Sequence, residues 1–352
     1  MVYFNCDYQT GAHPEVLEAL VRLNFEFAQG YGYDTATATA KKLIMKACGL
    51  TKGDVYLLTG GTQTNMVVLD RLLGRGEGVL CTETAHINVH EAGAIEAAGH
   101  KVIALPVHDG KLMARDVKEY LDKFYADATW RHMSRPGAVY ISHPTELGTL
   151  YTQKELTELS EVCRAARLPL YLDGARMAYG LMAPGAELSL KDIASLCDIF
   201  YIGGTKCGTL LGEAVVSGNK KLLDGFLTHA KSHGALLAKG RVLGIQFCAL
   251  FSNDLYRRIG AHAIKLAMEI RNGFLERGYL LYIDSPTNQQ FVLLPNRVLD
   301  ALRKKVSFEL WGPRQAEKTP VRFVTSWSTT EEDVRTLFHA LDHLPEECFS
   351  AE

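Results

Sequence analysis

The chain has 352 residues, of which 47% are hydrophobic and 22% charged, and its formal net charge of −2 gives no reason to expect nucleic acid or an anionic membrane as a partner. No apolar run is long enough to cross a bilayer, and the first residues lack the basic and apolar stretches of a secretory signal. The eight cysteines are scattered without paired spacing, which argues against disulfides and zinc sites and favours a reducing cytoplasm.

Short apolar strands alternate with amphipathic helices over residues 55–216. Strands separated by helices of this length predict βαβ units, and continuous apolar strands indicate a sheet covered on both faces. We therefore expect an α/β fold with a mainly parallel, seven-stranded sheet. The expected strands are 55–59, 78–82, 101–106, 138–143, 169–173, 198–203 and 213–217. The expected helices between them include 66–73, 117–125 and 153–166.

The first of these strands ends in a pattern suited to an anion. Gly60, Gly61 and Thr62 follow the strand and lead into a helix, so free backbone N–H groups and the helix dipole favour a phosphate there. The motif is neither GxGxxG nor a P-loop, which argues against a nucleotide. The alternative is an ordinary glycine-rich turn before a helix. If a phosphate binds, the hydroxyl of Thr62 is the expected side-chain donor.

A histidine follows the strand that ends near residue 82. His86 can act as an acid or a base near neutral pH, and at a strand tip its ring can lie flat on an aromatic cofactor. His90 comes one helical turn later, a spacing also found in metal-binding pairs. We expect no acidic or thiolate partners to cluster with these two residues, so no metal site is predicted.

Two later strand ends carry the strongest functional signal. Asp173 ends one apolar strand, and Lys206 follows another within Gly-Gly-Thr-Lys-Cys-Gly at 203–208. Apolar surroundings disfavour an ammonium ion, so Lys206 is expected to act as a nucleophilic amine. Each residue alone has a structural alternative, a helix N-cap for Asp173 and an exposed turn for Lys206. Together they predict an enzyme that uses pyridoxal 5'-phosphate (PLP). The lysine would hold the aldehyde of this cofactor, and the carboxylate would face its pyridine nitrogen. Thr205 would be a further hydrogen-bond donor.

The pattern changes near residue 245 to that of a smaller α+β unit. We interpret residues 1–245 as an N-terminal arm and a large cofactor domain, and residues 246–352 as a small domain. Ser328 and Glu331 fit a capping box that opens the last helix. The expected elements are one long helix or two in tandem over 245–271, strands at 278–284, 290–294, 306–311 and 321–326, and a helix over about 329–344.

One strand of this smaller unit carries Arg322 between apolar neighbours. A bidentate arginine suits the carboxylate of an amino-acid substrate, and the flanking strand residues would fix its direction. The alternative is a surface arginine on an edge strand.

Taken together, these motifs resemble the low-specificity L-threonine aldolases, within the β-eliminating lyase/threonine aldolase group of fold type I PLP enzymes. The resemblance covers essentially the whole chain. It implies the PLP-dependent transferase-like fold, PLP as cofactor and a small amino acid as substrate. The motifs that carry it are Gly-Gly-Thr-Gln-Thr-Asn at 60–65, Ala-His-Ile at 85–87, Leu-Asp-Gly-Ala-Arg at 172–176, Thr-Lys-Cys-Gly at 205–208 and Val-Arg-Phe-Val-Thr at 321–325.

The resemblance also implies roles for single residues. Lys206 would bind the cofactor aldehyde, Asp173 would pair with the pyridine nitrogen, and His86 would stack on the ring. Arg176 would lie near the cofactor oxygen or the substrate, and Arg322 would bind the substrate carboxylate.

Because the site of this family lies between subunits, the resemblance implies a homo-oligomer, either a dimer or a tetramer. Tyr31 resembles the tyrosine that reaches into a neighbour's site. Arg241 resembles the cross-subunit arginine near the phosphate.

The sequence departs from the family pattern at positions that affect substrate choice. A serine that commonly helps to hold the substrate carboxylate is here Cys6, and a histidine often present after the Arg322 strand is Ser326. The expected reaction is retro-aldol cleavage of L-threonine or L-allo-threonine to glycine and an aldehyde, with His86 as the base. The alternatives are another PLP-dependent lyase (β-elimination), a racemase, or a non-catalytic PLP-binding homologue, which the presence of both Lys206 and Asp173 disfavours.

Overall fold

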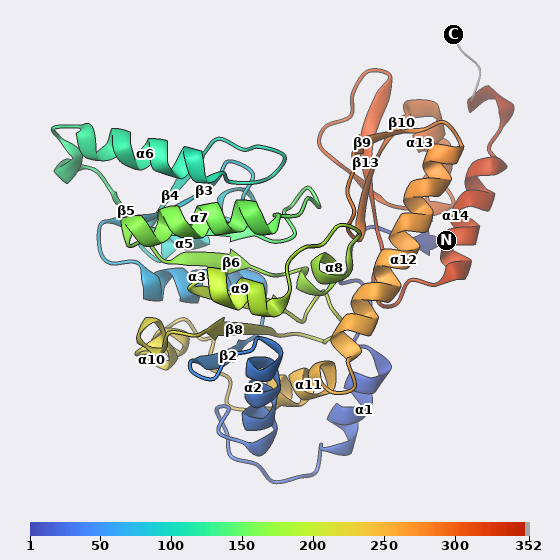
Figure 1. Cartoon of the computed structure of the whole chain (residues 1–352). Coiled ribbons are helices and arrows are strands. Elements are labelled where there is room, and N and C mark those ends of the chain that lie inside the picture. Colours follow the sequence, from blue (N-terminus) through green and yellow to red (C-terminus); the bar gives the residue numbers. More distant parts are fainter. Residues whose placement is uncertain (349–352) are drawn as a thin grey trace.

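A seven-stranded sheet lies at the centre of the larger part of the molecule (Figure 1). The computed structural model describes residues 1–348. The strands of this sheet are β2 (Asp54–Leu58), β3 (Glu77–Thr82), β4 (Lys101–Leu105), β5 (Arg135–Ser142), β6 (Leu170–Asp173), β7 (Ile199–Gly203) and β8 (Glu213–Ser217). Their order is β2-β8-β7-β6-β5-β3-β4, and neighbours are parallel except where β8 meets β7 and β2. The expected α/β fold with a mainly parallel, seven-stranded sheet is confirmed.

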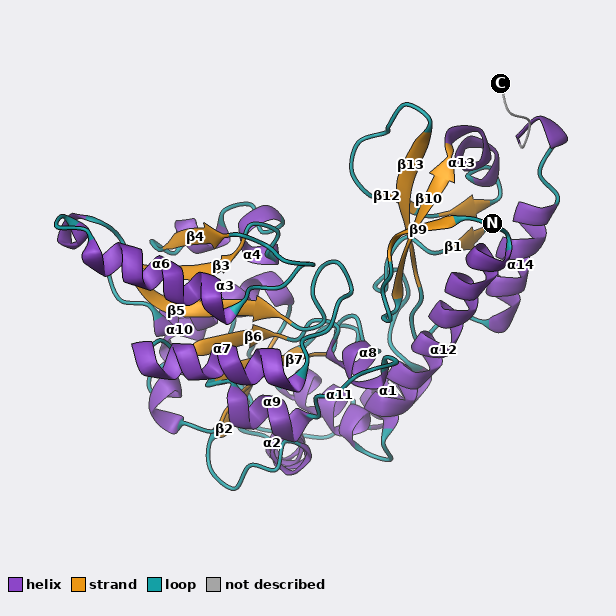
Figure 2. Cartoon of the chain, turned by 45° about the horizontal axis from the view of Figure 1, so that its top comes forward, coloured by secondary structure: helices purple, strands orange, loops and turns teal. Residues whose placement is uncertain are grey.

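Helices cover both faces of this sheet, which explains why every residue of β7 and β8 is buried (Figure 2). Buried side chains form a separate cluster on each face, with Ile44 and Leu156 in one and Val67 and Phe226 in the other. The first face packs against α2 (Thr35–Ala47), α6 (Ala114–Ala126), α7 (Gln153–Ala166) and α9 (Leu190–Leu196). The second packs against α3 (Gly61–Leu72), α4 (His86–Val89), α5 (Ala94–Ala97) and α10 (Phe226–Ser232).

Two sheets form the smaller part of the molecule. Its strands are β1 (Val2–Tyr3), β9 (Leu280–Ile283), β10 (Gln289–Pro295), β11 (Val306–Ser307), β12 (Glu309–Leu310) and β13 (Lys318–Val324). The antiparallel sheet has the order β12-β13-β10-β9, while β1 pairs in parallel with β11. The expectation of one strand at 306–311 is therefore wrong. Its two ends pair with different sheets, and Phe308 between them is buried in the core.

Tandem helices connect the two parts. The remaining helices are α1 (Pro14–Arg22), α8 (Met177–Met182), α11 (Arg241–Phe251), α12 (Leu255–Glu276), α13 (Asn296–Leu302) and α14 (Glu331–Asp342). The expected helical segment 245–271 is divided because Asn253 and Asp254 adopt left-handed conformations, with φ of 51° and 57°. Beyond this break, α12 runs from α8 of the larger part to β10 and α14 of the smaller part (Figure 1). The domain boundary near residue 245 stays a prediction.

The capping box of the last helix lies two residues later than expected. Thr330 is the N-cap of α14, and its hydroxyl accepts the N–H of Asp333 at 3.1 Å, while the Asp333 carboxylate accepts the N–H of Thr330 at 2.8 Å. The expected box of Ser328 and Glu331 is wrong because the Ser328 hydroxyl contacts Thr10 instead, at 3.0 Å.

Within the described residues, every helix falls short of the length or hydrophobicity that crossing a membrane would need. All eight cysteines lie in this part of the chain and are free. No group of side chains among residues 1–348 is arranged to hold a metal ion.

At Gly244, helix α11 packs closely against α2. A Cβ at residue 244 would lie 2.4 to 2.6 Å from three atoms of Thr37, two of which are backbone and cannot rotate away. Alanine favours a helix by about 1 kcal/mol over glycine, whereas forcing an extra methyl into a packed contact costs roughly 1–3 kcal/mol.

Because two of the clashing atoms are backbone, we place the cost at the upper end of this range and expect Gly244→Ala to lower the free energy of unfolding by about 2 kcal/mol in urea denaturation. Lys42→Ala, on the exposed side of α2, is the control and should stay within about 0.5 kcal/mol of the wild type. A Gly244→Ala protein as stable as the wild type would contradict the close packing.

Candidate active site

The carboxyl ends of the central strands surround a cavity of about 220 Å³. Open α/β sheets bind ligands at this edge. Most of the site residues expected from the sequence line the cavity, namely Gly61, Thr62, His86, Asp173, Arg176, Thr205 and Lys206. Other lining residues were not singled out from the sequence, among them Tyr8, Glu146, Tyr201 and Glu213.

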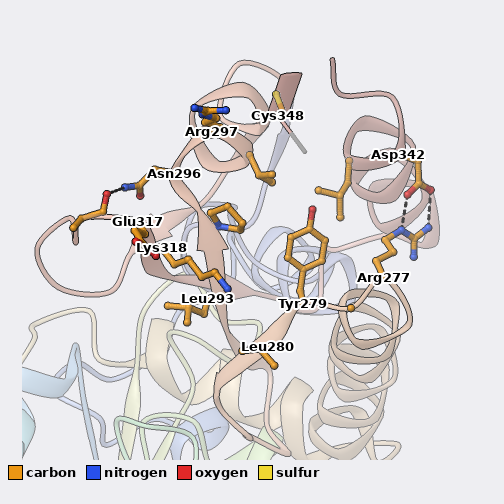
Figure 3. A pocket seen from close by; sticks show the side chains of 15 residues that line it. Arg277, Tyr279, Leu280, Leu293, Asn296, Arg297, Glu317, Lys318, Asp342 and Cys348 are labelled. Carbon is orange, nitrogen blue, oxygen red and sulfur yellow. Dashed lines mark hydrogen bonds and ion pairs between the residues drawn. The ribbon is translucent and has the colours of Figure 1, made fainter. Parts of the chain in front are cut away.

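A larger cavity of about 1000 Å³ lies in the smaller part of the molecule, and none of the expected site residues lines it (Figure 3). Its Arg277 is already held by two hydrogen bonds to the Asp342 carboxylate, at 2.6 and 2.7 Å. Because a reactive site needs convergent groups that are free to act on a ligand, the smaller cavity is the candidate active site.

The start of α3 forms an anion cradle in this cavity. Gly60 is the N-cap and supplies no side chain to bind the first N–H groups of the helix, so these remain available to a ligand. Gly60 itself does not line the cavity, whereas Gly61 and Thr62 do. A Cβ on Gly61 would lie 3.2 Å from the Tyr201 hydroxyl, so glycine keeps the cradle open. Helix α3 begins at Gly61 and not at the expected residue 66. Its first turn is polar, so the apolar pattern used for the prediction does not reach it.

Lys206 lies in the turn that directly follows β7, and its side chain is partly buried. Burial and the charge of the Arg176 guanidinium lower the pKa of Lys206, as expected for a nucleophilic lysine. The loop is fixed by its own backbone, since the N–H groups of Gly204 and Thr205 both donate to the Gly212 carbonyl. The Thr205 hydroxyl accepts the N–H of Gly212 at 3.0 Å, so this threonine shapes the lysine loop.

Asp173 is held as a carboxylate by convergent donors at the tip of β6. Its Oδ2 accepts hydrogen bonds from the Tyr140 hydroxyl at 2.7 Å and from Asn65 Nδ2 at 3.0 Å, and its Oδ1 accepts the N–H of Ala175 at 2.9 Å. Burial would raise the pKa of Asp173, but the nearby His86 charge and these hydrogen bonds hold it below its usual value. An ionised carboxylate at this point is what a protonated pyridine nitrogen requires.

His86 stands among carboxyl groups at the cavity wall. Its Nδ1 lies 2.7 Å from Oε1 of Glu91, whose side chain is fully buried, and its backbone N–H donates to Oε1 of Glu146 at 3.0 Å. The expectation that no acidic side chain accompanies His86 and His90 is therefore wrong for His86. The signal was available, because Glu91 follows His90 directly in the sequence.

Arg176 forms a buried ion pair with the N-terminal arm. Its Nε and Nη2 donate to the two oxygens of Asp7, at 2.7 and 3.0 Å, which leaves Nη1 for a ligand. Asn288 donates to the same carboxylate at 2.9 Å. Burial would raise the pKa of Asp7, but the Arg176 and Lys206 charges hold it below its usual value. Sequence analysis missed Asp7 because its partners lie far away in the chain.

Glu213 is a second acid that sequence analysis missed. It opens β8 opposite Gly203 of β7 and accepts the N–H of Gly204 at 3.1 Å. Burial raises the pKa of Glu213 to about 8, so the carboxyl holds its proton at neutral pH. A charged residue at the start of an otherwise apolar strand was the available signal.

Arg322 does not line the cavity but lies within electrostatic reach of Arg176 and Asp7. Its Nη1 donates to Oε1 of Gln289 at 3.0 Å and its Nη2 to the Asn5 carbonyl at 3.3 Å, while its Nε is buried without a partner. Burial and the charge of Arg176 lower the pKa of Arg322. A buried guanidinium with an open donor fits an anionic ligand.

Three further expected residues lie away from this cavity. Cys6 lines a different small cavity, close to the chain end. Tyr31 is 44% exposed and lies beside Lys231, and Arg241 donates to two carbonyls of the loop after α1. Their expected roles stay predictions.

The lining fits a phosphorylated pyridine aldehyde. The open N–H groups of α3 suit a phosphate, the lysine with its lowered pKa suits an aldehyde, and the Asp173 carboxylate suits a ring nitrogen. Lys206 and Asp173 line the same cavity as Gly61, so one ligand can contact all three.

Comparisons with known proteins agree with this fit. Residues 4–289 match the family described as beta-eliminating lyase. The solved structure of Leishmania major threonine aldolase is 38% identical, with a TM-score of 0.93, and the match covers 97% of this chain and 99% of that one. The low specificity L-threonine aldolase of a Pseudomonas species is 31% identical over 346 residues, or 95% of each chain. An aspartate aminotransferase of Thermus thermophilus shares the fold at 14% identity and a TM-score of 0.68, covering 97% of this chain and 90% of that one.

The family match spans most of the chain, and the Pseudomonas relative is similar over nearly its whole length. The expected fold type I architecture, the PLP cofactor and the lyase class are confirmed with it. The chain belongs to the beta-eliminating lyase family.

Proposed function

We propose that the protein is a PLP-dependent aldolase that cleaves β-hydroxy-α-amino acids, such as L-threonine and L-allo-threonine, to glycine and an aldehyde. The observation that carries the proposal is the placement of Lys206, Asp173 and His86 around one cavity. The names of the Leishmania and Pseudomonas relatives favour this reaction over β-elimination or racemisation. An aldehyde-detection assay on a panel of β-hydroxy amino acids tests the proposal. Holoenzyme that releases no aldehyde from any of them would reject it.

The residues of the cavity divide the work of this reaction. Bound PLP supplies an aldehyde for Lys206 and a pyridine ring that takes up the electrons of the broken bond. Asp173 stabilises positive charge at the ring nitrogen. His86 accepts the proton of the substrate β-hydroxyl, and the electron pair of that O–H bond becomes the second carbon–oxygen bond of the aldehyde as Cα–Cβ breaks.

The substrate carboxylate decides which bond at Cα breaks, because its position fixes the orientation of the other bonds. The open Nη1 of Arg176 and the buried, unpartnered Nε of Arg322 are the donors that we assign to it. Cys6 stays a candidate for a lesser contact, since it lies next to Asp7 in the chain.

We also propose a homo-oligomer, a dimer or a tetramer, whose subunits complete each other's sites. Phe25 and Phe27, in the loop after α1, are 91% and 106% exposed. Apolar exposure of this kind marks an interaction surface. Arg241 donates to two carbonyls of the same loop, and Tyr31 follows in it. Both residues therefore belong to a surface that a second copy of the chain would cover. In that arrangement, Tyr31 and Arg241 would reach the cavity of the second copy.

The compartment that we propose is the cytoplasm. The eight cysteines are all free, and several are buried. Disulfides form and persist in oxidising compartments, so this cysteine usage favours a reducing one.

Purified protein should be yellow and should carry its cofactor on Lys206. Burial lowers the pKa of this lysine, so its amine is available to the aldehyde. Borohydride reduction followed by peptide mass mapping measures the position of the label. Lys111, which forms an ion pair with Glu155, serves as an internal control and should remain unlabelled. A label on another lysine, or no cofactor, would contradict the assignment.

Asp173→Asn should retain most cofactor binding but lower kcat by roughly 10²–10³-fold, because a neutral amide does not stabilise charge at the ring nitrogen. Steady-state kinetics and the absorption spectrum of the bound cofactor measure the two effects. Asp122→Asn, on the exposed side of α6, is the control and should leave both unchanged. Near-normal turnover in the Asp173 variant would mean that another carboxylate serves the ring.

Mixed oligomers of two inactive variants should regain part of the activity. In a hybrid of Lys206→Ala and Arg241→Ala subunits, one site carries both lesions and the other carries neither, if Arg241 acts across the interface. Native mass spectrometry measures subunit exchange, and the aldehyde assay measures recovery. Exchange without any recovery would place Arg241 outside the neighbour's site.

A further inference from the structure

Glu91 makes the closest side-chain contact of His86. A single oxygen, Oε1, lies 2.7 Å from His86 Nδ1 and 2.7 Å from Asn65 Nδ2. The Glu91 side chain is fully buried, whereas 34% of the His86 side chain is exposed. The histidine therefore has one nitrogen fixed in the interior and the rest of its ring open to the cavity.

The neighbours of Asn65 determine where the proton between His86 and Glu91 lies. The Asn65 Oδ1 accepts the Tyr171 hydroxyl at 2.8 Å, and Nδ2 donates to both Glu91 and Asp173. The opposite orientation of the amide would place its oxygen against two carboxylates, which repel it. Oε1 of Glu91 is thus an acceptor from Asn65.

The same oxygen lies against His86 Nδ1, where an ionised Glu91 can only accept a hydrogen bond. A carboxylate has no proton of its own to give, so the proton of the short contact is on the histidine. In the neutral ring only one nitrogen carries a proton, which leaves the other with its lone pair.

Building on the proposed function, we propose that Glu91 is a positioning residue that holds a proton on Nδ1 of His86 and so presents Nε2 as the proton acceptor in the cavity. When Nε2 takes up the β-hydroxyl proton, the ring carries N–H groups on both nitrogens. Its positive charge then faces the buried Glu91 carboxylate.

The other titratable groups around His86 modulate this pair. Asp173 on β6 lies within electrostatic reach of His86. The Glu146 carboxyl accepts the His86 backbone N–H, and the centroids of the His90 and His86 rings are 5.6 Å apart. Of these groups, only Glu91 contacts a ring nitrogen of His86 directly. Removal of the Glu91 charge is therefore the change that isolates the proposed role.

The tautomer can be measured in the wild-type holoenzyme without any substrate. Ring-¹⁵N histidine labelling with long-range proton–nitrogen NMR distinguishes a protonated nitrogen from one with a lone pair, and loss of a signal set in His86→Gln assigns residue 86. In the neutral ring we expect a protonated Nδ1 and a bare Nε2. A protonated Nε2 and a bare Nδ1 would overturn the proposal.

Kinetics of Glu91→Gln give the second readout. Without the carboxylate, the charged form of the His86 ring is less stable, so the acidic limb of kcat/KM against pH should move to lower pH. We expect kcat to fall by roughly 100-fold, with KM changed by less than about threefold. Glu91→Asp, which keeps the charge, should recover part of kcat and of the wild-type pH profile.

Glu83→Gln is the matched control, since the same chemical change occurs three residues before His86 on an exposed side chain. It should behave as the wild type.

Wild-type kcat and an unshifted pH profile in Glu91→Gln would overturn the proposal. If Glu91→Gln does not fold, the tautomer seen in the wild-type NMR spectrum alone decides whether the proposal holds. A wild-type protein inactive on every β-hydroxy amino acid would reject the proposed function, yet the ring spectrum would still show whether Glu91 sets the tautomer.

Discussion

The burial of an ionised carboxylate at the tip of β6 is the constraint on which the rest of the site depends. A charge taken out of water is costly unless donors surround it, and Asp173 receives them from β5, α3 and its own turn. Asn65 is shared with Glu91, which in turn contacts His86. The group that faces a cofactor ring and the group that moves a proton therefore belong to one hydrogen-bonded network.

A buried ion pair joins the two parts of the molecule at the same cavity. Asp7 comes from the N-terminal arm, Arg176 from the turn after β6, and Asn288 from the residues just before β10. Because β1 pairs with β11, the arm is anchored in the smaller part while its carboxylate reaches the larger one. Movement of the smaller part would thus change the position of Arg176, one of the two guanidinium groups assigned to the substrate carboxylate.

The parts of the site that could be predicted are those whose residues belong to a short motif in the sequence. Gly61, Thr62, Asp173 and Lys206 each belong to a local pattern of strand, turn and glycine, so their chemistry is visible in a short segment. Glu91 was visible too, but it was overlooked because its significance depends on which ring nitrogen it contacts.

The sequence by itself determined the alternation of strands and helices, the cofactor class and the lysine–aspartate pair, because periodicity and strand-end motifs are local properties. Only the tertiary structure decided the pairing of β1 with β11, the division of residues 306–311 between two sheets, and the partnership of Asp7 with Arg176. These contacts join segments far apart in the chain, and no local pattern records the partner of a buried charge. The raised pKa of Glu213 has the same origin, since burial by distant segments is a property of the folded chain.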